Sequence, residues 1–496
     1  MTSTTTMSER DALRLDGLTL DAIRDRRVAV LGFARSGVAL ARFLADAGAR
    51  VAVYDIRPPS ELADEADRLE GRPVELRLGS EVDPAEVLAT AELVATSPSV
   101  SAHYPTTEPR LRAALAALES GGRVPVVSEV DLFLRLCPAT TIGVTGTKGK
   151  TTTASVTAAI LEAGDRRVWL GGNIGQPLIE RVPEMRSADR VVIELSELQI
   201  PTLSRGTDLA VYTNVTADHL DRHGSLEAYR AVKLRLAELT RARGGTLVVN
   251  DDDPVVRAIP RPGDRVVRYS RSNIPAGGVG VADAWVTSGS GPIVPLAEIP
   301  LPGDHSVSNV LAAIAVGVHF GIPAAAMRDA VRAFRGVAHR LETVATLDGV
   351  RFVNDSMGTQ PDAVIAALRA FDPPVVLIAG GREKDVDLAE LATEVAERAH
   401  AAVLIGESAA RFEGLFRDAG LSRIERARDM DDAVAIAARI ARDASSAARG
   451  TGTAIVLLSP AAASFDMFRN YEERGLAFRD AVARLADEPG AGEARA

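Results

Sequence analysis

A stretch rich in glycine, threonine and lysine lies at residues 141–153, with the sequence TIGVTGTKGKTTT. Glycines let backbone N–H groups turn towards oxyanions, Lys150 supplies a cation, and the Thr151 hydroxyl can bind Mg²⁺. A short apolar run precedes this loop and a helical run follows from Ala154, so a helix N-terminus adds to the attraction for anions. Val144 replaces the first glycine of G-x-x-x-x-G-K-[ST], leaving the shorter T-G-T-K-G-K-T-T. The stretch predicts a loop that binds a nucleoside triphosphate.

Carboxylate and imidazole groups follow two later strand patterns. Glu194 lies near the end of the apolar run 191–197, and beside a phosphate-binding loop it is a candidate Mg²⁺ ligand or water-orienting group. After a predicted strand at 209–212 come Asp218, His219, Asp221 and His223. No cysteine and no third ligand segment accompanies them, which disfavours zinc. A site for a hard metal ion, built around an oxygen-rich substrate, fits these groups better.

One lysine lies in the predicted helix 226–239, at Lys233. From composition alone, a lysine on a helix is expected at the solvated surface. The residues themselves therefore give Lys233 no chemical role.

Composition bounds the class of protein. The 496 residues carry 57 basic and 67 acidic side chains, a balance that argues against general binding of nucleic acid or of anionic membranes. The one cysteine, Cys137, excludes an internal disulfide and fits a reducing cytosol. Residues 1–20 lack the apolar core of a signal peptide, and no apolar run reaches the length of about eighteen residues that spans a membrane. A cytoplasmic location is expected.

A β-α-β pattern opens the chain. A buried-strand run at 28–31 leads through the turn G-F-A-R-S-G into a helical pattern, and a second strand run at 51–54 ends on Asp55. This is the outline of a dinucleotide-binding unit, but Ala34 replaces the middle glycine of G-x-G-x-x-G, which disfavours NAD. Asp55 suits a ribose or a uracil edge equally well. A nucleotide-containing ligand is favoured, with a purely structural unit as the alternative.

Strand and helix patterns alternate again after residue 339, with strand runs at 350–354, 375–379, 402–405 and 454–458. Such alternation predicts a parallel α/β domain. We therefore predict an α/β protein of three domains, with a Rossmann-like N-terminal domain, a central P-loop ATP-binding domain and a Rossmann-like C-terminal domain. The predicted bounds are an extension at 1–24, domains at 25–138, 139–338 and 339–486, and a flexible tail at 487–496.

An ordered set of motifs across residues 25–485 resembles that of the Mur ligases, ATP-dependent amino-acid-adding enzymes of peptidoglycan synthesis. In chain order the motifs are TGTKGKTT, GGNIG, ELSELQ, NVTADHLDR, YRAVKLR, AHRLE, NDS and LLSPAAASFD. Each is weak alone, but their order and spacing together are specific. The first β-α-β unit, NVTADHLDR and the ending SFDMFRNYEERG are most similar to the branch that adds D-glutamate to UDP-N-acetylmuramoyl-L-alanine.

The resemblance implies a reaction and a set of residues for it. ATP would phosphorylate the substrate carboxylate, and the glutamate amine would attack the acyl phosphate through a tetrahedral intermediate. The catalytic set implied is Lys150, Glu194, His219 and Lys233. Mg²⁺ would be held by Glu194, His219 and Lys233, with Thr151 as a further ligand. Lys233 matches a family position that CO₂ carbamylates, and a carbamate turns this cation into an anionic oxygen ligand.

Binding residues carry over by position. The ATP-binding set implied is Gly146, Thr147, Lys148, Gly149, Lys150, Thr151, Thr152, Asn309, Arg340 and Asp355. The uridine nucleotide would face Ser36, Asp55, Arg57 and Ser97, and the muramoyl part Asn173 and Ser196. Thr359 joins the substrate-binding set, and the glutamate would be held by Lys384, Ser464 and Tyr471. The protein is expected to act as a monomer, with no nucleic-acid or membrane partner.

Departures from the family pattern lie in the third domain and after Glu194. The usual N-D-S-K-x-T-N is here NDSMGTQ, so Met357 replaces a lysine and Gln360 an asparagine, and Glu197 adds a carboxylate to ELSE. Methionine cannot bind an anion by charge, so the identity and configuration of the amino acid stay open. The alternatives are ligation of L-glutamate or another acceptor, a non-catalytic nucleotide-binding relative, a P-loop phosphotransferase, and a folylpolyglutamate synthase.

Overall fold

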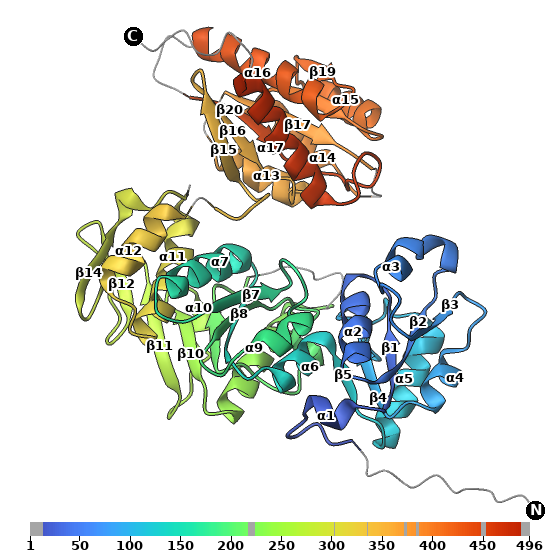
Figure 1. Ribbon diagram of the computed structural model, residues 1–496. Helices are drawn as coiled ribbons and strands as arrows, with labels where there is room; N and C mark the ends of the chain where they lie inside the picture. Colours follow the sequence, from blue (N-terminus) through green and yellow to red (C-terminus); the bar gives the residue numbers. More distant parts are fainter. Residues whose placement is uncertain are drawn as a thin grey trace, which may run out of the picture. The chain divides into compact units, whose positions relative to one another are not determined.

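The computed structural model describes residues 13–216, 224–301, 303–334, 336–371, 374–382, 386–447 and 453–487. The chain separates into two compact units, Met1–Ile299 with His305–Arg332, and Pro300–Asp304 with Ala333–Ala496. The first unit contains two sheets and the second contains one, each flanked by helices (Figure 1). The predicted three-domain α/β architecture is confirmed. Within the described residues, every helix is too short or too polar to cross a membrane.

The first sheet is parallel throughout and has the strand order β3-β2-β1-β4-β5. Its strands are β1 Arg27–Leu31, β2 Arg50–Asp55, β3 Val74–Leu78, β4 Leu93–Thr96 and β5 Val126–Ser128. The helices around it are α1 Leu20–Ile23, α2 Arg35–Asp46, η1 Pro59–Glu61, α3 Ala63–Asp67, α4 Pro84–Ala89, α5 Pro109–Gly121 and α6 Glu129–Leu136. Helices α2 and α6 pack on one face, and α4 and α5 on the other. Both faces are therefore covered, as a parallel sheet requires.

The second sheet contains the phosphate-binding loop and has the order β14-β13-β12-β11-β10-β9-β6-β8-β7. Its strands are β6 Thr140–Thr145, β7 Val168–Gly172, β8 Arg190–Glu194, β9 Leu209–Tyr212, β10 Thr246–Asn250, β11 Arg265–Ser270, β12 Val279–Ala282, β13 Trp285–Ser288 and β14 Gly291–Pro295. Its helices are α7 Lys150–Glu162, η2 Leu178–Glu184, η3 Ile200–Thr202, α9 Leu226–Ala242, α10 Pro254–Arg257, η4 Leu296–Glu298, α11 Asp304–His319 and α12 Ala324–Ala333. At the edge of this sheet, β12, β13 and β14 form an antiparallel meander.

One apolar core continues from the first sheet into the second, because the buried face of α2 and α6 meets η2. Buried hydrogen bonds reinforce this joint. Asp131 of α6 is fully buried, and its carboxylate accepts from the Ser204 backbone N–H at 2.7 Å and from the Ser204 hydroxyl at 2.6 Å. The Arg135 guanidinium donates to the same carboxylate oxygen as the Ser204 hydroxyl, at 3.0 Å. The two sheets of the first unit are thus joined by an apolar core and by buried hydrogen bonds.

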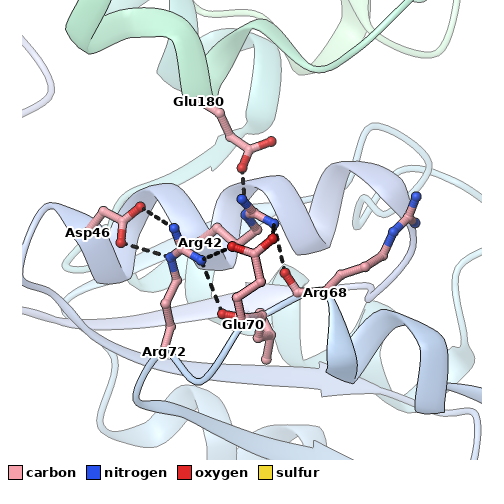
Figure 2. Close-up of polar contacts among 7 residues, drawn as sticks. Arg42, Asp46, Arg68, Glu70, Arg72 and Glu180 are labelled. Carbon is pink, nitrogen blue, oxygen red and sulfur yellow. Dashed lines mark hydrogen bonds and ion pairs between the residues drawn. The ribbon is translucent and has the colours of Figure 1, made fainter.

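A charged network lies beside the same joint (Figure 2). The Arg42 guanidinium of α2 pairs with Glu180 of η2 at 2.8 Å and with Glu70 at 3.0 Å, while Arg72 pairs with Asp46 and Glu70. The side chains of Arg42 and Glu180 are 24% and 33% exposed, so solvent screens their pair and its contribution stays within about 1 kcal/mol. The apolar core and the Asp131 hydrogen bonds therefore carry most of the joint.

The sheet of the second unit has the order β15-β16-β20-β17-β18-β19. Its strands are β15 Glu342–Leu347, β16 Val350–Asn354, β17 Val375–Gly380, β18 Ala399–Ile405, β19 Ile424–Arg426 and β20 Ala454–Leu458. Helices α13 Pro361–Arg369, α14 Ala389–Arg398 and α15 Ala409–Asp418 cover one face, and α16 Met430–Ala447 and α17 Tyr471–Asp487 the other. The expectation of a parallel domain is corrected at one edge, where β15 runs antiparallel to β16. Asp348 and Gly349 make the two-residue turn between them, both with positive φ.

Gly37 sets how closely α2 approaches the end of β1. A Cβ built on Gly37 would lie 1.8 Å from the Gly32 carbonyl oxygen, which is backbone and cannot move aside cheaply. We expect Gly37→Ala to destabilise the protein by about 1–3 kcal/mol or more, the cost of overpacking a rigid contact. Thermal unfolding followed by circular dichroism measures the change.

The matched control is Gly121→Ala at the end of α5, where an added Cβ meets no atom within 4 Å. Alanine is a better helix former than glycine, so this variant should be neutral or up to about 1 kcal/mol more stable. Equal midpoints for the two variants would contradict the packing role of Gly37.

Candidate active site

The predicted phosphate-binding loop connects β6 to α7 and is held in a narrow space. Gly149 has φ +81°, and a Cβ there would lie 2.3 Å from the Asn309 side-chain oxygen. A Cβ on Gly146 would lie 1.9 Å from the Thr213 hydroxyl. Lys150 folds back over the loop, and its ammonium donates to the carbonyls of Gly146 at 3.1 Å and Thr147 at 2.7 Å. Positions 146 and 149 therefore have room only for glycine. The charge of Lys150 is held over the loop backbone.

Helix α7 begins directly after this loop, at Lys150. Within the described residues, no side chain caps the helix at Gly149. Lys150, Thr151 and Thr152 form its first turn, and Thr151 is buried. A helix start without a capping side chain is a site for an anion. The loop therefore fits a nucleotide phosphate.

Asn309 brings a distant segment to the same loop. It lies on α11, is buried, and accepts a hydrogen bond from the Thr153 hydroxyl at 3.3 Å. Its side chain is the one that a Cβ on Gly149 would strike. The structure thus places the predicted ATP residue Asn309 beside the phosphate-binding loop.

Glu194 ends β8 directly beside the loop. Strand β8 pairs with β6 so that Glu194 lies opposite Val144, and the Leu195 N–H donates to the Val144 carbonyl at 2.9 Å. Glu194 is only 2% exposed, and its Oε1 accepts from the Asn173 amide at 3.0 Å. Its Oε2 is buried and has no hydrogen-bond partner among the described residues.

Mg²⁺ takes oxygen ligands from one or two carboxylates together with substrate phosphates. A carboxylate oxygen without a hydrogen-bond partner, placed next to a phosphate-binding loop, is therefore suited to bind Mg²⁺. The predicted residues present here therefore fit the metal. In the described part of the chain, no group of three or more His, Cys, Asp or Glu side chains could hold a metal ion by itself. The predicted ligand His219 lies outside the described residues, as do Asp218, Asp221 and His223.

Lys233 is buried, which corrects the surface position that composition alone predicts. It lies on α9 with no exposed surface, and its ammonium is 5.4 Å from the centroid of the Tyr229 ring. The Tyr229 hydroxyl is 3.1 Å from the Thr147 hydroxyl, so one side chain separates Lys233 from the phosphate-binding loop. The chain has only four lysines, at 148, 150, 233 and 384, among 57 basic residues. In such an arginine-rich chain, the rarity of lysine indicates that Lys233 is not an ordinary surface residue. The prediction of a surface position did not take this rarity into account.

The predicted muramoyl residues lie on the loops after β7 and β8. Asn173 is exposed apart from its contact with Glu194. The Ser196 backbone N–H and hydroxyl both donate to the Gln199 side-chain oxygen, at 2.9 and 3.1 Å. Glu197 is buried next to them. These residues therefore share one edge of the sheet with Glu194.

The predicted uridine residues meet at the carboxyl edge of the first sheet. The Asp55 carboxylate accepts from the Phe33 N–H at 2.7 Å and from the Arg57 guanidinium at 2.9 and 3.0 Å. Burial alone would raise the pKa of Asp55, but the hydrogen bonds from Arg57 and Phe33 outweigh it and the pKa is lowered. The Ser97 hydroxyl donates to the Gly32 carbonyl at 3.3 Å. Ser36 lies in the first turn of α2 and is half-buried.

In the second unit, Asp355 follows β16 and is buried. One carboxylate oxygen accepts from the Ser459 hydroxyl at 2.7 Å, and the other from the Leu341 N–H at 3.2 Å. Burial raises the pKa of Asp355 to about 6, although the Ser459 hydrogen bond and the nearby Arg340 oppose the shift. Arg340 itself is exposed. The Asp355 carboxyl group is thus buried and held in place by these two hydrogen bonds.

Tyr471, which is predicted to hold glutamate, lies near a buried arginine that sequence reasoning missed. Arg474 is 1% exposed, and its guanidinium donates to the Ser356 hydroxyl and carbonyl at 3.0 and 2.9 Å and to the Ala462 carbonyl at 3.1 Å. The Ser356 hydroxyl in turn donates to the Tyr471 carbonyl at 2.8 Å. Arg474 therefore ties together the NDS segment, the segment before Ser464 and the start of α17.

Three more residues of the second unit belong to the predicted substrate-binding set. Thr359 is half-buried, and its N–H donates to the Met357 carbonyl at 2.8 Å. Ser464 is buried. Lys384 lies outside the described residues. Arginine is mostly a surface residue by type, so the sequence around Arg474 gave no signal of its burial.

Comparison with known protein families gives three matches along the chain. Residues 26–118 match the Mur ligase MurD-like N-terminal domain, residues 144–317 the Mur ligase middle domain, and residues 339–461 the glutamate ligase domain of Mur ligases. The chain is 39% identical to the UDP-N-acetylmuramoylalanine–D-glutamate ligase of Symbiobacterium thermophilum over 93% of this chain and 98% of that protein. It is 38% identical to the enzyme of the same name from Pelotomaculum thermopropionicum, with the same coverage.

Among solved structures, the UDP-N-acetylmuramate–alanine ligase of Thermotoga maritima aligns with a TM-score of 0.57 at 18% identity. The alignment covers 94% of this chain and 100% of that one. At this identity the likeness speaks for the fold.

The raised pKa of Asp355 makes a prediction about stability. The folded state keeps a proton on Asp355 up to about pH 6, whereas the unfolded chain releases it near 3.8. The wild type therefore loses stability as pH rises between these values, by up to about 3 kcal/mol for a shift of this size. Asparagine has no proton to lose, so Asp355→Asn should be more stable than the wild type above pH 6 and gain nothing below pH 4. Urea unfolding at a series of pH values measures this.

Asp348→Asn is the matched control, because Asp348 is exposed in a two-residue turn that asparagine also suits. The change in stability with pH should be larger for Asp355→Asn than for this control. A pH-independent difference between Asp355→Asn and the wild type would contradict the prediction.

Proposed function

This chain belongs to the Mur ligase family, and from that premise we propose that it joins D-glutamate to UDP-N-acetylmuramoyl-L-alanine. The chain is an ATP-dependent ligase of peptidoglycan precursor synthesis that forms a carbon–nitrogen bond. The observation that supports the proposal most directly is the buried Glu194 carboxylate in register with the phosphate-binding loop. We place the reaction in the cytoplasm, where ATP and nucleotide sugars are available, and assign a monomer.

The chemistry explains why the site needs so many cationic and N–H groups. A carboxylate is a poor electrophile until one of its oxygens becomes a leaving group. ATP transfers its terminal phosphoryl group to that oxygen, giving an acyl phosphate and ADP. The glutamate amine then attacks the acyl carbon, and the tetrahedral intermediate expels inorganic phosphate. The first step brings two anions into contact, so the protein must offset their repulsion.

The phosphate-binding loop supplies that offset. We assign the loop residues from Gly146 to Thr152, with the Lys150 ammonium, to the phosphates of ATP. The Thr147 and Lys148 N–H groups donate to Asn214 at 2.8 and 3.0 Å, which holds the loop in shape. The Lys150 ammonium is held over the loop by its hydrogen bonds to the loop carbonyls. A preorganised cation and preorganised N–H groups stabilise charge in transfer without a cost of reorientation. Asn309, Arg340 and Asp355 complete the proposed ATP site.

Bound Mg²⁺ would offset the phosphate charge and polarise the transferred group. We assign Glu194, His219, Lys233 and Thr151 to hold it. A buried ammonium would repel a metal ion and costs several kcal/mol to desolvate, whereas its carbamate presents anionic oxygen. We therefore propose that Lys233, buried on α9, is carbamylated by CO₂.

The other two sets of residues are assigned to the organic substrates. Ser36, Asp55, Arg57 and Ser97 lie at one sheet edge and suit a uridine nucleotide. Asn173 and Ser196 follow strands of the central sheet and suit the muramoyl part. Lys384, Ser464 and Tyr471 are assigned to glutamate, and Thr359 is kept in the substrate-binding set. With Met357 in place of a lysine, the charge for the glutamate carboxylates must come from Lys384 or from arginine.

The proposal is tested by phosphate release with ATP, Mg²⁺ and UDP-N-acetylmuramoyl-L-alanine, with D-glutamate, L-glutamate or neither. Release that depends on D-glutamate, with a product heavier by one glutamyl group, is expected. Dependence on L-glutamate would make Met357 a specificity change and overturn the configuration. Absence of release with either amino acid would overturn the ligase assignment in favour of another acceptor or a non-catalytic protein.

Carbamylation of Lys233 has its own measurement. In ¹³C-bicarbonate, the wild type should show a carbamate carbon resonance that is absent in Lys233→Arg. Because the chain has only four lysines, assignment of that signal is direct. Arginine keeps the positive charge but cannot become the carbamate ligand, so ligase turnover should fall about 10²-fold or more, as when a preorganised electrostatic group is removed. An unchanged spectrum in Lys233→Arg would refute the modification.

A further inference from the structure

The loop after β7 holds Glu194 by two separate contacts. The Asn173 backbone N–H donates to the Glu194 carbonyl at 2.9 Å, and the Asn173 side-chain amide donates to Glu194 Oε1 at 3.0 Å. The preceding Gly172 makes this approach possible. It has φ +94°, and a Cβ on it would lie 2.3 Å from the Glu194 carbonyl oxygen. The G-G-N sequence is therefore shaped around Glu194.

The two oxygens of Glu194 differ as a result. Oε1 is occupied by the Asn173 amide, and Oε2 is buried without a hydrogen-bond partner among the described residues. A buried carboxylate oxygen left unpaired costs free energy unless something binds it. The Asn173 contact thus selects which oxygen stays open and fixes the direction in which it points.

We infer that Asn173 is a positioning residue for Glu194, which fixes the direction of Oε2 so that this oxygen is the one presented to Mg²⁺. This inference rests on the proposed function for Glu194 as a metal ligand. It gives Asn173 a second role beside the proposed contact with the muramoyl part. Groups that hydrogen-bond a metal ligand orient it and commonly change metal affinity by about 10–100-fold when removed.

The position of Asn173 makes the inference testable without unfolding the protein. The residue is exposed apart from this contact, so its replacement removes little packing. Asn173→Leu keeps the approximate volume and loses the donor. Gln176→Ala is the matched control, since Gln176 is exposed in the same loop and belongs to no proposed binding set. Glu194→Gln shows how far the affinity for the metal ion falls when the charge of the ligand itself is lost.

The experiment titrates Mn²⁺ into the full chain and reads free Mn²⁺ by electron paramagnetic resonance, with and without a non-hydrolysable ATP analogue and without the uridine substrate. We expect Asn173→Leu to weaken Mn²⁺ binding about 10–100-fold, with Gln176→Ala unchanged and the thermal midpoints of all variants preserved. In turnover, kcat should fall in Asn173→Leu more than the KM for the uridine substrate rises.

Mn²⁺ affinity in Asn173→Leu equal to that of the wild type, together with a raised KM for the uridine substrate, would overturn the inference and leave Asn173 as a substrate contact only. Failure of the wild type to bind Mn²⁺ in either state would overturn it as well. The titration needs no turnover. It therefore stands apart from the product assay, whose failure would count against the ligase reaction and not against the Asn173 contact.

Discussion

The site depends on the register between three parallel strands. The Leu195 N–H reaches the Val144 carbonyl at 2.9 Å and the Thr213 N–H reaches the Thr145 carbonyl at 3.0 Å, so β8 and β9 end level with β6. Because β6 lies between them, the loops after all three strands open at one edge. A one-residue slip in the pairing of β8 with β6 would turn Glu194 to the other face of the sheet. The ladder of backbone hydrogen bonds therefore positions the chemistry before any side chain contributes.

That geometry lets an acidic protein bind anions. The chain carries a formal net charge of −10, so a nucleotide and a carboxylate substrate cannot be drawn in by the overall field. Binding must be local, and the groups proposed for it are the start of α7, Lys150 and the Asp55–Arg57 pair at the end of β2. All but four of the 57 basic side chains are arginines, and many of those that the structure describes pair with carboxylates, such as Arg42 with Glu70 and Glu180. The four lysines are Lys148 and Lys150 of the phosphate-binding loop, the buried Lys233, and Lys384.

Features that require one particular residue type could be predicted from the sequence. Glycines at 146 and 149, a lysine and a threonine after an apolar run specify the phosphate-binding loop, and the structure shows the glycines in spaces too small for a Cβ. The buried strands were equally clear, because strands covered on both faces are continuous apolar runs. The edges were not. Strand β3 alternates exposed and half-buried residues, and β15 was missed although the Asp348–Gly349 pair after it is a strong hairpin signal.

Pairing between distant residues was beyond the sequence for a different reason. Nothing in the spacing of Asn173 and Glu194 shows that one amide closes one carboxylate oxygen, since that depends on β7 lying beside β8 in register. The same holds for Arg474, whose partners are separated from it by up to 118 residues in the chain. A buried guanidinium whose three partners here are neutral is costly, and it is retained where its forked donors fix several segments at once. Asn173 and Arg474 both look ordinary in the sequence. Each holds other residues in place, and this role is visible only in the contacts of the folded chain.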